Sequence, residues 1–245
     1  MIVGASTDIG IVRQINQDSM FVSKNSDFPL FIVADGMGGH KAGEVASEMA
    51  VSIITTSLSS RLMDDDVIVN IEKEILDSIK KANRELLNHS QVIEDCNGMG
   101  TTITLGYIKD AKLYVGHVGD SRAYIIRNEE LKQITDDHSL VNELLKNGDI
   151  SIEEAMKHPQ KNVITRAVGT NEDICIDINS FELKENDIIL FCSDGLTNMI
   201  EEHELKDLFI GIKDVQEACD SAVSLAKDKG GRDNITVIGI RFLLR

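Results

Sequence analysis

Aspartates at the ends of apolar runs are the residues whose type and spacing best suit chemistry. Residues 31–34 lead directly into Asp35 and Gly36, and a second apolar run reaches Asp194 through one serine. Asp233 comes just before a third apolar run. A buried strand that ends in Asp-Gly presents a carboxylate at the sheet edge and frees the next carbonyl to turn outward. Such oxygens are the ligands that Mg²⁺ and Mn²⁺ prefer, so we predict that these acids converge on a metal cluster.

The prediction of a metal cluster depends on the whole set of acids. A single Asp-Gly is more typical of a turn, and an isolated Asp233 is typical of the start of a strand. Asp18 and Asp120, however, also stand beside apolar strands. Carboxylates brought together raise each other's pKa, which is costly unless cations offset their charge. Because the donors are oxygens and histidines are few, we expect two Mn²⁺ or Mg²⁺ ions rather than zinc.

A two-metal centre would suit the hydrolysis of phosphate esters. Two divalent ions about 3.5–4 Å apart can share one water and lower its pKa, which yields a hydroxide near neutral pH. Such a hydroxide suits in-line attack on phosphorus, where charge stabilisation is the main help that a protein can add. Arg13, five residues before Asp18, could hold the phosphate with its planar guanidinium; the alternative is an ordinary surface arginine.

The motifs of other phosphate chemistries are absent from the sequence. There is no Gly-x-x-x-x-Gly-Lys-[Ser/Thr] phosphate loop and no Gly-x-Ser-x-Gly elbow. None of the four cysteines is followed six residues later by an arginine, and their spacing suggests neither metal nor redox chemistry.

Charge and hydropathy bound the partners and the compartment. The net charge of −16 repels nucleic acid and anionic membranes, so we expect neither as a partner. The sequence has no apolar run of membrane-spanning length and no signal-peptide pattern at its start, so we expect a cytoplasmic protein.

Hydrophobic periodicity predicts the elements that position the acids. Helices are expected over 41–58, 68–86, 201–209 and 214–229, and hairpin strands over 101–134. The polar stretch 137–169 is interpreted as an insertion on one face. Hairpins make antiparallel sheets, and the apolar helix faces need sheets to cover. We therefore predict an α+β fold: a four-layer α-β-β-α sandwich of two mainly antiparallel sheets flanked by helix pairs, in a single domain of residues 1–245.

Seven motifs occur in the order found in one enzyme family and cover essentially the whole chain. They are Thr7-Asp8-x-Gly10, Arg13-x-x-Asn16-x-Asp18, Asp35-Gly-Met-Gly-Gly-His40, Gly100-Thr-Thr102, Val118-Gly-Asp120-Ser-Arg122, Ser193-Asp194-Gly195 and Arg232-Asp233-Asn234-Ile-Thr236. The sequence resembles the type-2C metal-dependent protein phosphatases, the PPM family, in their compact bacterial form. The resemblance implies the α-β-β-α sandwich, a flap formed by about residues 137–169, and hydrolysis of phosphoserine and phosphothreonine in proteins by a metal-bridging hydroxide.

The resemblance also implies roles for four residues in the core of the site. Asp35 would bridge the two metals, and the carbonyl of Gly36 would bind one of them. Asp194 and Asp233 would complete the shell of the other metal.

Three more roles follow from the same resemblance. Asp18 would hold metal-bound waters, and Arg13 would bind the substrate phosphate. Asp120, together with Asp194, would form a weaker third metal site near the flap.

Two positions depart from the family pattern. Members commonly carry glutamate where this chain has Gln17, so one charge is missing beside the second metal, although the amide can still accept a hydrogen bond from a bound water. Many eukaryotic members have a proposed general acid, a histidine, where this chain has Met37. We predict that His40 is the acid; its alternative role is to fix the corner by hydrogen bonding.

These observations predict an Mn²⁺- or Mg²⁺-dependent serine/threonine phosphatase. It would act as a monomer on phosphorylated proteins and oppose a cognate serine/threonine kinase. The flap is expected to govern substrate choice because it is the least core-like segment beside the site. One alternative is a regulatory module that binds metal without catalysis, against which the intact acids argue. The other is a nucleotide hydrolase, against which the missing phosphate loop and basic pocket argue.

Overall fold

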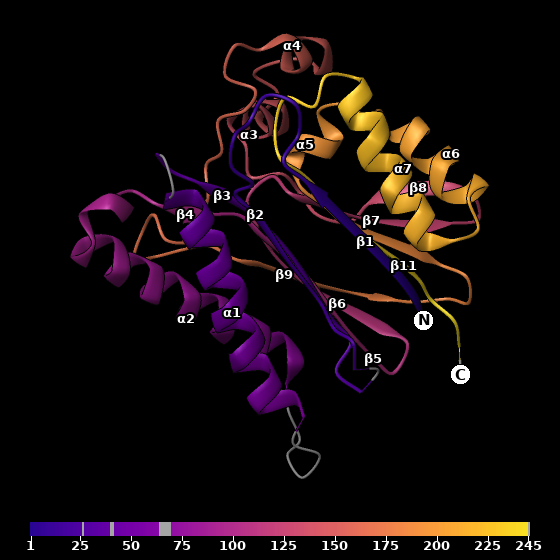
Figure 1. Ribbon diagram of the computed structural model, residues 1–245, viewed down its shortest axis with the longest axis horizontal. Helices are drawn as coiled ribbons and strands as arrows, with labels where there is room; N and C mark the ends of the chain where they lie inside the picture. The colour runs from indigo at the N-terminus through magenta and orange to yellow at the C-terminus, as the bar shows by residue number, and fades with distance from the viewer. Residues whose placement is uncertain (26, 40–41, 64–69, 245) are drawn as a thin grey trace.

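Two antiparallel sheets lie face to face between two layers of helices (Figure 1). This computed structural model describes residues 1–25, 27–39, 42–63 and 70–244. All pairs of neighbouring strands in the two sheets are antiparallel in the described chain. The predicted α-β-β-α sandwich is therefore confirmed.

Each sheet combines strands from distant parts of the sequence. The first sheet contains, in spatial order, β1 (Ile2–Asp8), β11 (Ile235–Arg241), β10 (Ile188–Cys192), β7 (Arg122–Arg127) and β8 (Glu130–Gln133). The second contains β2 (Asp18–Val22), β3 (Leu30–Met37), β5 (Ile103–Lys109), β6 (Lys112–Val118) and β9 (Asp177–Glu182), with β4 (Gly100–Thr101) paired to β3. Because β1 pairs with β11, the two ends of the chain lie together (Figure 1).

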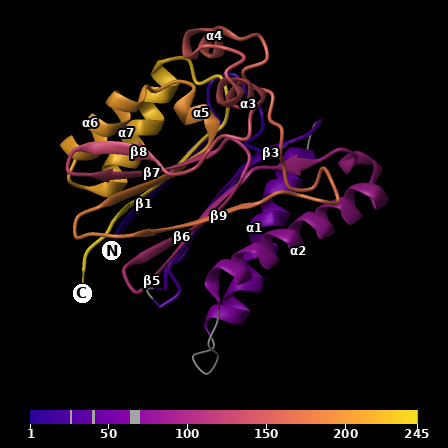
Figure 2. The same ribbon diagram turned by 180° about the vertical axis from the view of Figure 1, so that it is seen from behind.

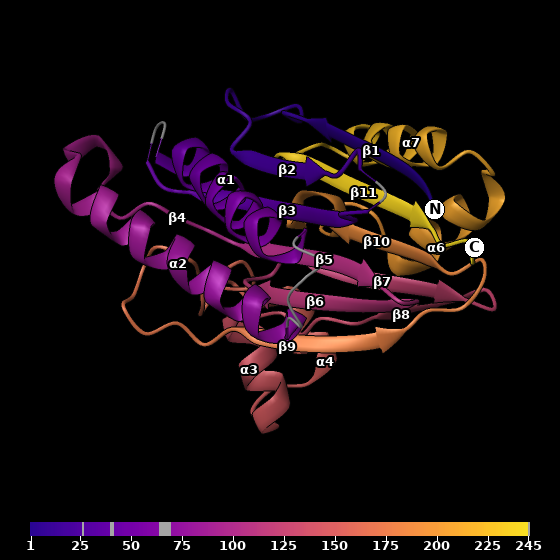
Figure 3. The same ribbon diagram turned by 90° about the horizontal axis from the view of Figure 1, so that it is seen from below.

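The helices cover the outer faces of the sheets, as Figure 3 shows from below. The second sheet is covered by α1 (Ala42–Leu62) and α2 (Ile71–Val92), which the short 3₁₀ helix η1 (Glu94–Cys96) follows. The first sheet is covered by α5 (Asp194–Thr197), α6 (Glu202–Gly211) and α7 (Val215–Asp228). None of the described helices combines the length and the apolar character needed to cross a membrane.

The two sheets meet through a core of large apolar side chains. Phe31 and Val33 from β3 pack in one cluster with Phe191 from β10 and Ile238 from β11. On the outer face of the second sheet, the alanines of α1 allow close packing: Ala46 and the alanines one turn away on either side, Ala42 and Ala50, are buried. Burial of this apolar area is the main favourable term that holds the layers together.

The polar stretch 137–169 carries two short helices, α3 (Leu140–Asn147) and α4 (Ile152–Lys157). Ser139 begins α3 and Ser151 begins α4, and each serine accepts a hydrogen bond from a backbone N–H of the first turn. Figures 1 and 2 show both helices at the same end of the molecule as α5. The flap therefore lies at the end of the sandwich where β10 runs into Asp194.

The sequence predicts that two strands end at the Asp-Gly pairs, and the structure differs at both. Asp35 lies inside β3, which continues to Met37, and Asp194 begins α5 rather than ending a strand. A Cβ at Gly36 would lie 2.0 Å from a carbonyl oxygen of α1, and one at Gly195 would lie 1.9 Å from the carbonyl oxygen of Asn234. The glycines are required by close backbone approach, which places helix ends directly against the acids.

Candidate functional site

Asp18 and Asp35 are the centre of the site on the second sheet. They are directly opposite each other in the pairing of β2 with β3. Asp18 is 8% exposed, and the backbone of Asp35 is held by the N–H and hydroxyl of Thr102 and the hydroxyl of Thr101. Like charges at opposite positions of a strand pair destabilise a sheet, so this pairing needs a compensating partner.

The other three aspartates approach from loops between the two sheets. Asp194 is the first residue of α5, and Asp233 stands in the loop that enters β11. Asp120 follows Gly119, whose φ of +113° makes the tight turn between β6 and β7. All five predicted aspartates are thus brought to the edge at which both sheets open.

Electrostatics shows how closely these carboxyls interact. Burial, and then the charges of Asp18 and Asp194, raise the pKa of Asp35 well above its ordinary value. Burial also raises the pKa of Asp18 to about 7, and the charges of Asp194 and Asp233 add to the effect. The pKa of Asp120 rises to about 7 from burial and the charge of Asp194. The cluster cannot be fully ionised at neutral pH without cations.

Asp194 completes this electrostatic cluster. Its pKa is raised by burial and by Asp233, against hydrogen bonds with Asp35 and Asn198 that lower it. Crowded carboxyls of this kind favour protonation unless a cation supplies the counter-charge.

The unpartnered carboxylate oxygens of the cluster and the oxygen character of its donors suit divalent cations. Asp18 and Asp194 each keep one carboxylate oxygen, Oδ1, that is buried and without a hydrogen-bond partner in the described chain. A buried oxygen without a hydrogen-bond partner costs free energy. A bound Mg²⁺ or Mn²⁺ would remove this cost, because both ions prefer oxygen ligands. Among the described residues, no group of three or more aspartate, glutamate, histidine or cysteine side chains is already arranged to hold a metal ion.

Arg13 lies where the sequence predicts, beside the cluster. Its guanidinium is 2.7 Å from Asp233 Oδ2, and about half of its side chain is exposed. The loop that carries it is fixed from within by Asn234, whose amide donates to the carbonyls of Ile9 and Ile15 and accepts from the N–H of Gln17. Sequence reasoning missed this role of Asn234, for which its place directly after Asp233 was the only signal.

Two other predicted positions can be described in part. The backbone carbonyl of Gln17 accepts hydrogen bonds from the N–H of Gly36 and from the Ser47 hydroxyl, and its side-chain amide lies close to Gly43 at the start of α1. Gly36 is buried in β3. His40 lies outside the described residues, so its predicted role stays a prediction.

Two buried histidines support the Asp120 turn from behind, which sequence reasoning also missed. His138 of the flap accepts a hydrogen bond from the N–H of Gly119 through Nδ1 and contacts Asp177 through Nε2. Its ring lies 4.8 Å from that of His117. Burial lowers the pKa of His138 and lowers that of His117 to about 4, so both rings stay neutral at pH 7.

A cavity of about 450 Å³ connects the acids to the flap. Asp120 and Asp194 line this cavity together with Ser139 and Lys161 of the flap. Arg122 at the start of β7 holds the flap in place through a bidentate pair with Asp137, with a shortest distance of 2.6 Å. The cavity therefore offers space for the substrate residues on either side of a bound phosphate.

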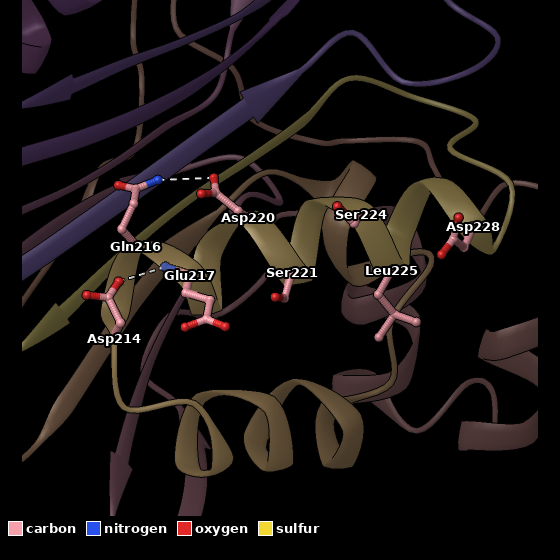
Figure 4. A pocket seen from close by; sticks show the side chains of 8 residues that line it. All are labelled: Asp214, Gln216, Glu217, Asp220, Ser221, Ser224, Leu225 and Asp228. Atoms are coloured by element: carbon pink, nitrogen blue, oxygen red, sulfur yellow. Dashed lines mark hydrogen bonds between the residues drawn. The ribbon is translucent and has the colours of Figure 1, made fainter.

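A second hollow, on the outer face of α7, is far simpler in chemistry (Figure 4). Two of its four acids bond within the helix: Asp214 accepts the N–H of Glu217 as the helix cap, and Asp220 accepts the amide of Gln216. None of the buried, unpartnered carboxylate oxygens of the described chain belongs to this hollow, so we place the chemistry at the sheet edge.

Comparison with known proteins finds protein phosphatases that are similar in sequence over nearly the whole chain. The family model described as protein phosphatase 2C matches residues 11–228. The serine/threonine phosphatase stp of Listeria monocytogenes serotype 4b is 41% identical over 236 residues, 95% of this chain and 92% of that protein. Protein phosphatase PhpP of Streptococcus pneumoniae is 40% identical over 240 residues, 97% of this chain and 96% of that one.

Solved structures are similar over nearly the whole chain. The serine/threonine phosphatase PstP/Ppp of Mycobacterium tuberculosis has a TM-score of 0.89 at 33% identity and covers 99% of this chain and 98% of its own. A serine/threonine phosphatase of S. agalactiae has the same TM-score at 39% identity, with 99% of both chains covered. The catalytic domain of PstP in complex with two manganese ions has a TM-score of 0.86 at 31% identity, covering 99% and 98%.

Proposed function

Because this chain belongs to the protein phosphatase 2C family and is a serine/threonine phosphatase of the PPM type, we propose that its aspartate cluster binds divalent cations and uses them to hydrolyse phosphoserine and phosphothreonine in proteins. The observation that carries the proposal is the pair of buried, unpartnered oxygens of Asp18 and Asp194 within a group of carboxyls that raise each other's pKa. Carboxyls whose pKa values are raised by burial and by neighbouring charges are typical of functional sites.

The residues that would hold the cations are those with oxygens at the sheet edge. Asp35, the carbonyl of Gly36, Asp194 and Asp233 would hold two Mn²⁺ or Mg²⁺ ions, which fits the two manganese ions of the similar PstP structure. Asp18 would orient water beside them. A weaker third ion would use Asp120 together with Asp194, both of which line the cavity beside the flap.

The cations and the chain make different contributions to the reaction. When bound, the cations supply Lewis acidity, lowering the pKa of water towards neutrality and offsetting phosphate charge. With this counter-charge in place, Asp35 and Asp194 would be held in the ionised form. Arg13 exchanges its contact with Asp233 for the substrate phosphate, which its planar fork of donors matches. In-line displacement at phosphorus needs this fixed orientation of phosphate and water.

We propose that His40 supplies the proton to the departing serine or threonine oxygen. The proposal rests on its position in the Asp35–His40 motif. A general acid sets one limb of the pH–rate profile, so His40→Ala is expected to lower kcat and remove that limb. An unchanged rate and pH profile would leave His40 only the role of fixing the corner.

The wider role follows from the reaction. Protein phosphoserine and phosphothreonine are made by kinases, so we propose that the enzyme opposes a serine/threonine kinase and acts on that kinase's substrates in the cytoplasm, as a monomer. The flap is proposed to select among these substrates, because it lines the cavity beside the acids.

The substrate class is tested by comparing kcat/KM at saturating Mn²⁺ for a phosphothreonine peptide, a phosphotyrosine peptide of the same sequence, and ATP. The phosphothreonine peptide is expected to be hydrolysed most efficiently by a wide margin. Preferential hydrolysis of ATP would instead support a nucleotide hydrolase. A folded protein that binds Mn²⁺ without turnover of any substrate would support a regulatory module.

A further inference from the structure

The carboxylate of Asp18 is held from the opposite sheet. Asp18 begins β2 in the second sheet, yet its Oδ2 accepts hydrogen bonds from Ser193 Oγ and from Thr236 Oγ1, both at 2.7 Å. Ser193 follows β10, and Thr236 is in β11, both strands of the first sheet. Asp18, Ser193 and Thr236 are each less than 9% exposed, so water does not compete for these bonds. The two hydroxyls form a clamp across the interface between the sheets.

The direction of each hydrogen bond in the clamp can be assigned. A hydroxyl can donate one hydrogen bond and a carboxylate only accepts, so Ser193 and Thr236 both donate to Asp18. The Thr7 hydroxyl, 2.8 Å from that of Thr236, must therefore donate to Thr236. Asn16 then donates to Thr7 at 3.0 Å and accepts the N–H of Asp18 at 3.2 Å. These bonds form a closed ring from the amide of Asp18 to its own carboxylate.

The clamp treats the two oxygens of Asp18 differently. Oδ2 receives two donors, whereas Oδ1 is buried and has no partner in the described chain. A rotation of the carboxylate would break both of these hydrogen bonds. The hydroxyls therefore keep Oδ1 turned away from them and available to the site. Asp18 is also the only acid that β2 contributes, because Gln17 precedes it.

From this geometry we propose that Thr236 and Ser193 are positioning residues which orient Asp18 so that Oδ1 faces the cation site, and which thereby set the affinity for the divalent cation. This inference rests on the proposed function, since it takes the cluster to bind cations. The mechanism is indirect: neither hydroxyl touches the cation or the phosphate. Outer residues that orient metal-binding groups commonly contribute 10- to 100-fold to metal affinity.

The test measures Mn²⁺ binding by titration calorimetry on the full-length protein and on four variants. Thr236→Val removes one clamp hydroxyl at nearly constant shape, and Ser193→Ala removes the other. Thr236→Ser keeps the hydroxyl and loses only a methyl group. Thr55→Val is the matched control, because the Thr55 hydroxyl of α1 is likewise buried but has no hydrogen-bond partner in the described chain.

Thr236→Val and Ser193→Ala are each expected to weaken Mn²⁺ binding by about 10- to 100-fold. Thr236→Ser and Thr55→Val should bind within about threefold of the unmodified protein, because the clamp survives in both. If Thr236→Val does not fold, Ser193→Ala carries the test alone. Unchanged Mn²⁺ affinity in a folded clamp variant, with only a lower melting temperature, would make the hydroxyls a tie between sheets and overturn the inference. Absence of Mn²⁺ binding by the unmodified protein would instead contradict the proposed function itself.

Discussion

At the scale of single residues, the site is a cluster of aspartates whose ionisation is disfavoured by burial. Asp35 and Asp18 face each other across β2 and β3, and Asp194 has one oxygen without a partner in the described chain. Arg13 lies against Asp233, and the charge of Arg122 lowers the pKa of Asp120. These guanidinium groups cannot offset five carboxylates, so the protonation of the acids and the binding of cations determine the behaviour of the site.

Arg13 is expected to act on phosphate binding. Replacement of Arg13 by alanine should lower kcat/KM for a phosphothreonine peptide by about 10- to 100-fold, mainly through KM, because a charge-assisted hydrogen bond contributes about 1.5–3 kcal/mol. Lysine at this position should recover only part of the loss, since it lacks the planar fork. Arg84→Ala, which removes an exposed arginine of α2, is the control. Equal KM values for Arg13→Ala and Arg84→Ala would exclude the phosphate role.

The raised pKa of Asp120 predicts how the stability of the cation-free protein depends on pH. Burial, followed by the charge of Asp194, raises this pKa to about 7, whereas an unfolded chain has the ordinary value of 3.8. Between these values the folded state holds the extra proton. The favourable contribution is thus complete below pH 3.8 and is lost as pH rises towards 7.

Asparagine at position 120 does not titrate, so the Asp120→Asn variant does not lose stability as Asp120 ionises. The free energy of unfolding of Asp120→Asn minus that of the unmodified protein should therefore increase by about 1–3 kcal/mol from pH 5 to pH 7.5 in chelator. Thermal melts of both proteins at the two pH values measure it, because comparison at each pH cancels the other titrating groups. Added Mn²⁺ at pH 7.5 should reduce the gap. A gap that is constant with pH would show that Asp120 is already ionised in the folded protein.

At the scale of elements, β7 connects the site to two different parts of the molecule. Arg122 at its first position holds Asp137 of the flap, and Arg127 at its last position holds Asp187 in the turn before β10. Both pairs are bidentate and involve a mostly buried aspartate. The strand therefore offers two similar ion pairs, of which only one reaches the flap.

Loss of the Arg122 pair is expected to loosen the flap. In Arg122→Ala, amide hydrogen exchange should accelerate across α3 and α4 while β10 and β11 stay protected, because local opening follows the loss of local contacts. Arg127→Ala is the matched control, and its faster exchange should be confined to the turn around Asp187. The kcat/KM for dephosphorylation of a phosphothreonine peptide should fall only in Arg122→Ala, through a higher KM. Equal exchange of the flap in both variants would show that other contacts fix it.

How far the sequence predicts these elements depends on the range of the interactions. The amphipathic pattern of α2 and the hairpin strands are local, and both are predicted correctly. The extension of β3 beyond Asp35 depends on pairing with β4, which lies more than sixty residues later. The clamp on Asp18 joins positions that are 175 and 218 residues apart. Motif order locates the acids, but only the fold shows which hydroxyls orient them.

At the scale of the whole molecule, the layers are held by the apolar interface that also brings the acids together. Phe191 of β10 is fully buried there, and its ring occupies the space where a Cβ of Gly106 would stand, 2.3 Å from its Cζ. The site is assembled from both sheets, so its geometry depends on how these sheets pack. Loosening this interface should affect the whole chain at once.

Phe191→Ala is expected to lower the free energy of unfolding by about 3–5 kcal/mol, because it leaves a cavity between the sheets. Val92→Ala, at the exposed end of α2, should change it by less than about 0.5 kcal/mol. Urea denaturation followed by circular dichroism measures both. A single transition is expected, as for one domain. Two separate transitions would show that the sheets with their helices unfold independently.

The most direct test of the central proposal is hydrolysis of a phosphothreonine peptide with Mn²⁺, with excess chelator, and by the Asp194→Ala variant with Mn²⁺. The proposed function predicts turnover with Mn²⁺, none with chelator, and a loss of at least about 1,000-fold in the variant, because transition-state charge stabilisation at phosphorus is the dominant catalytic effect. Turnover that persists in chelator, or that survives in a folded Asp194→Ala variant, would contradict a cation-dependent reaction at the aspartate cluster.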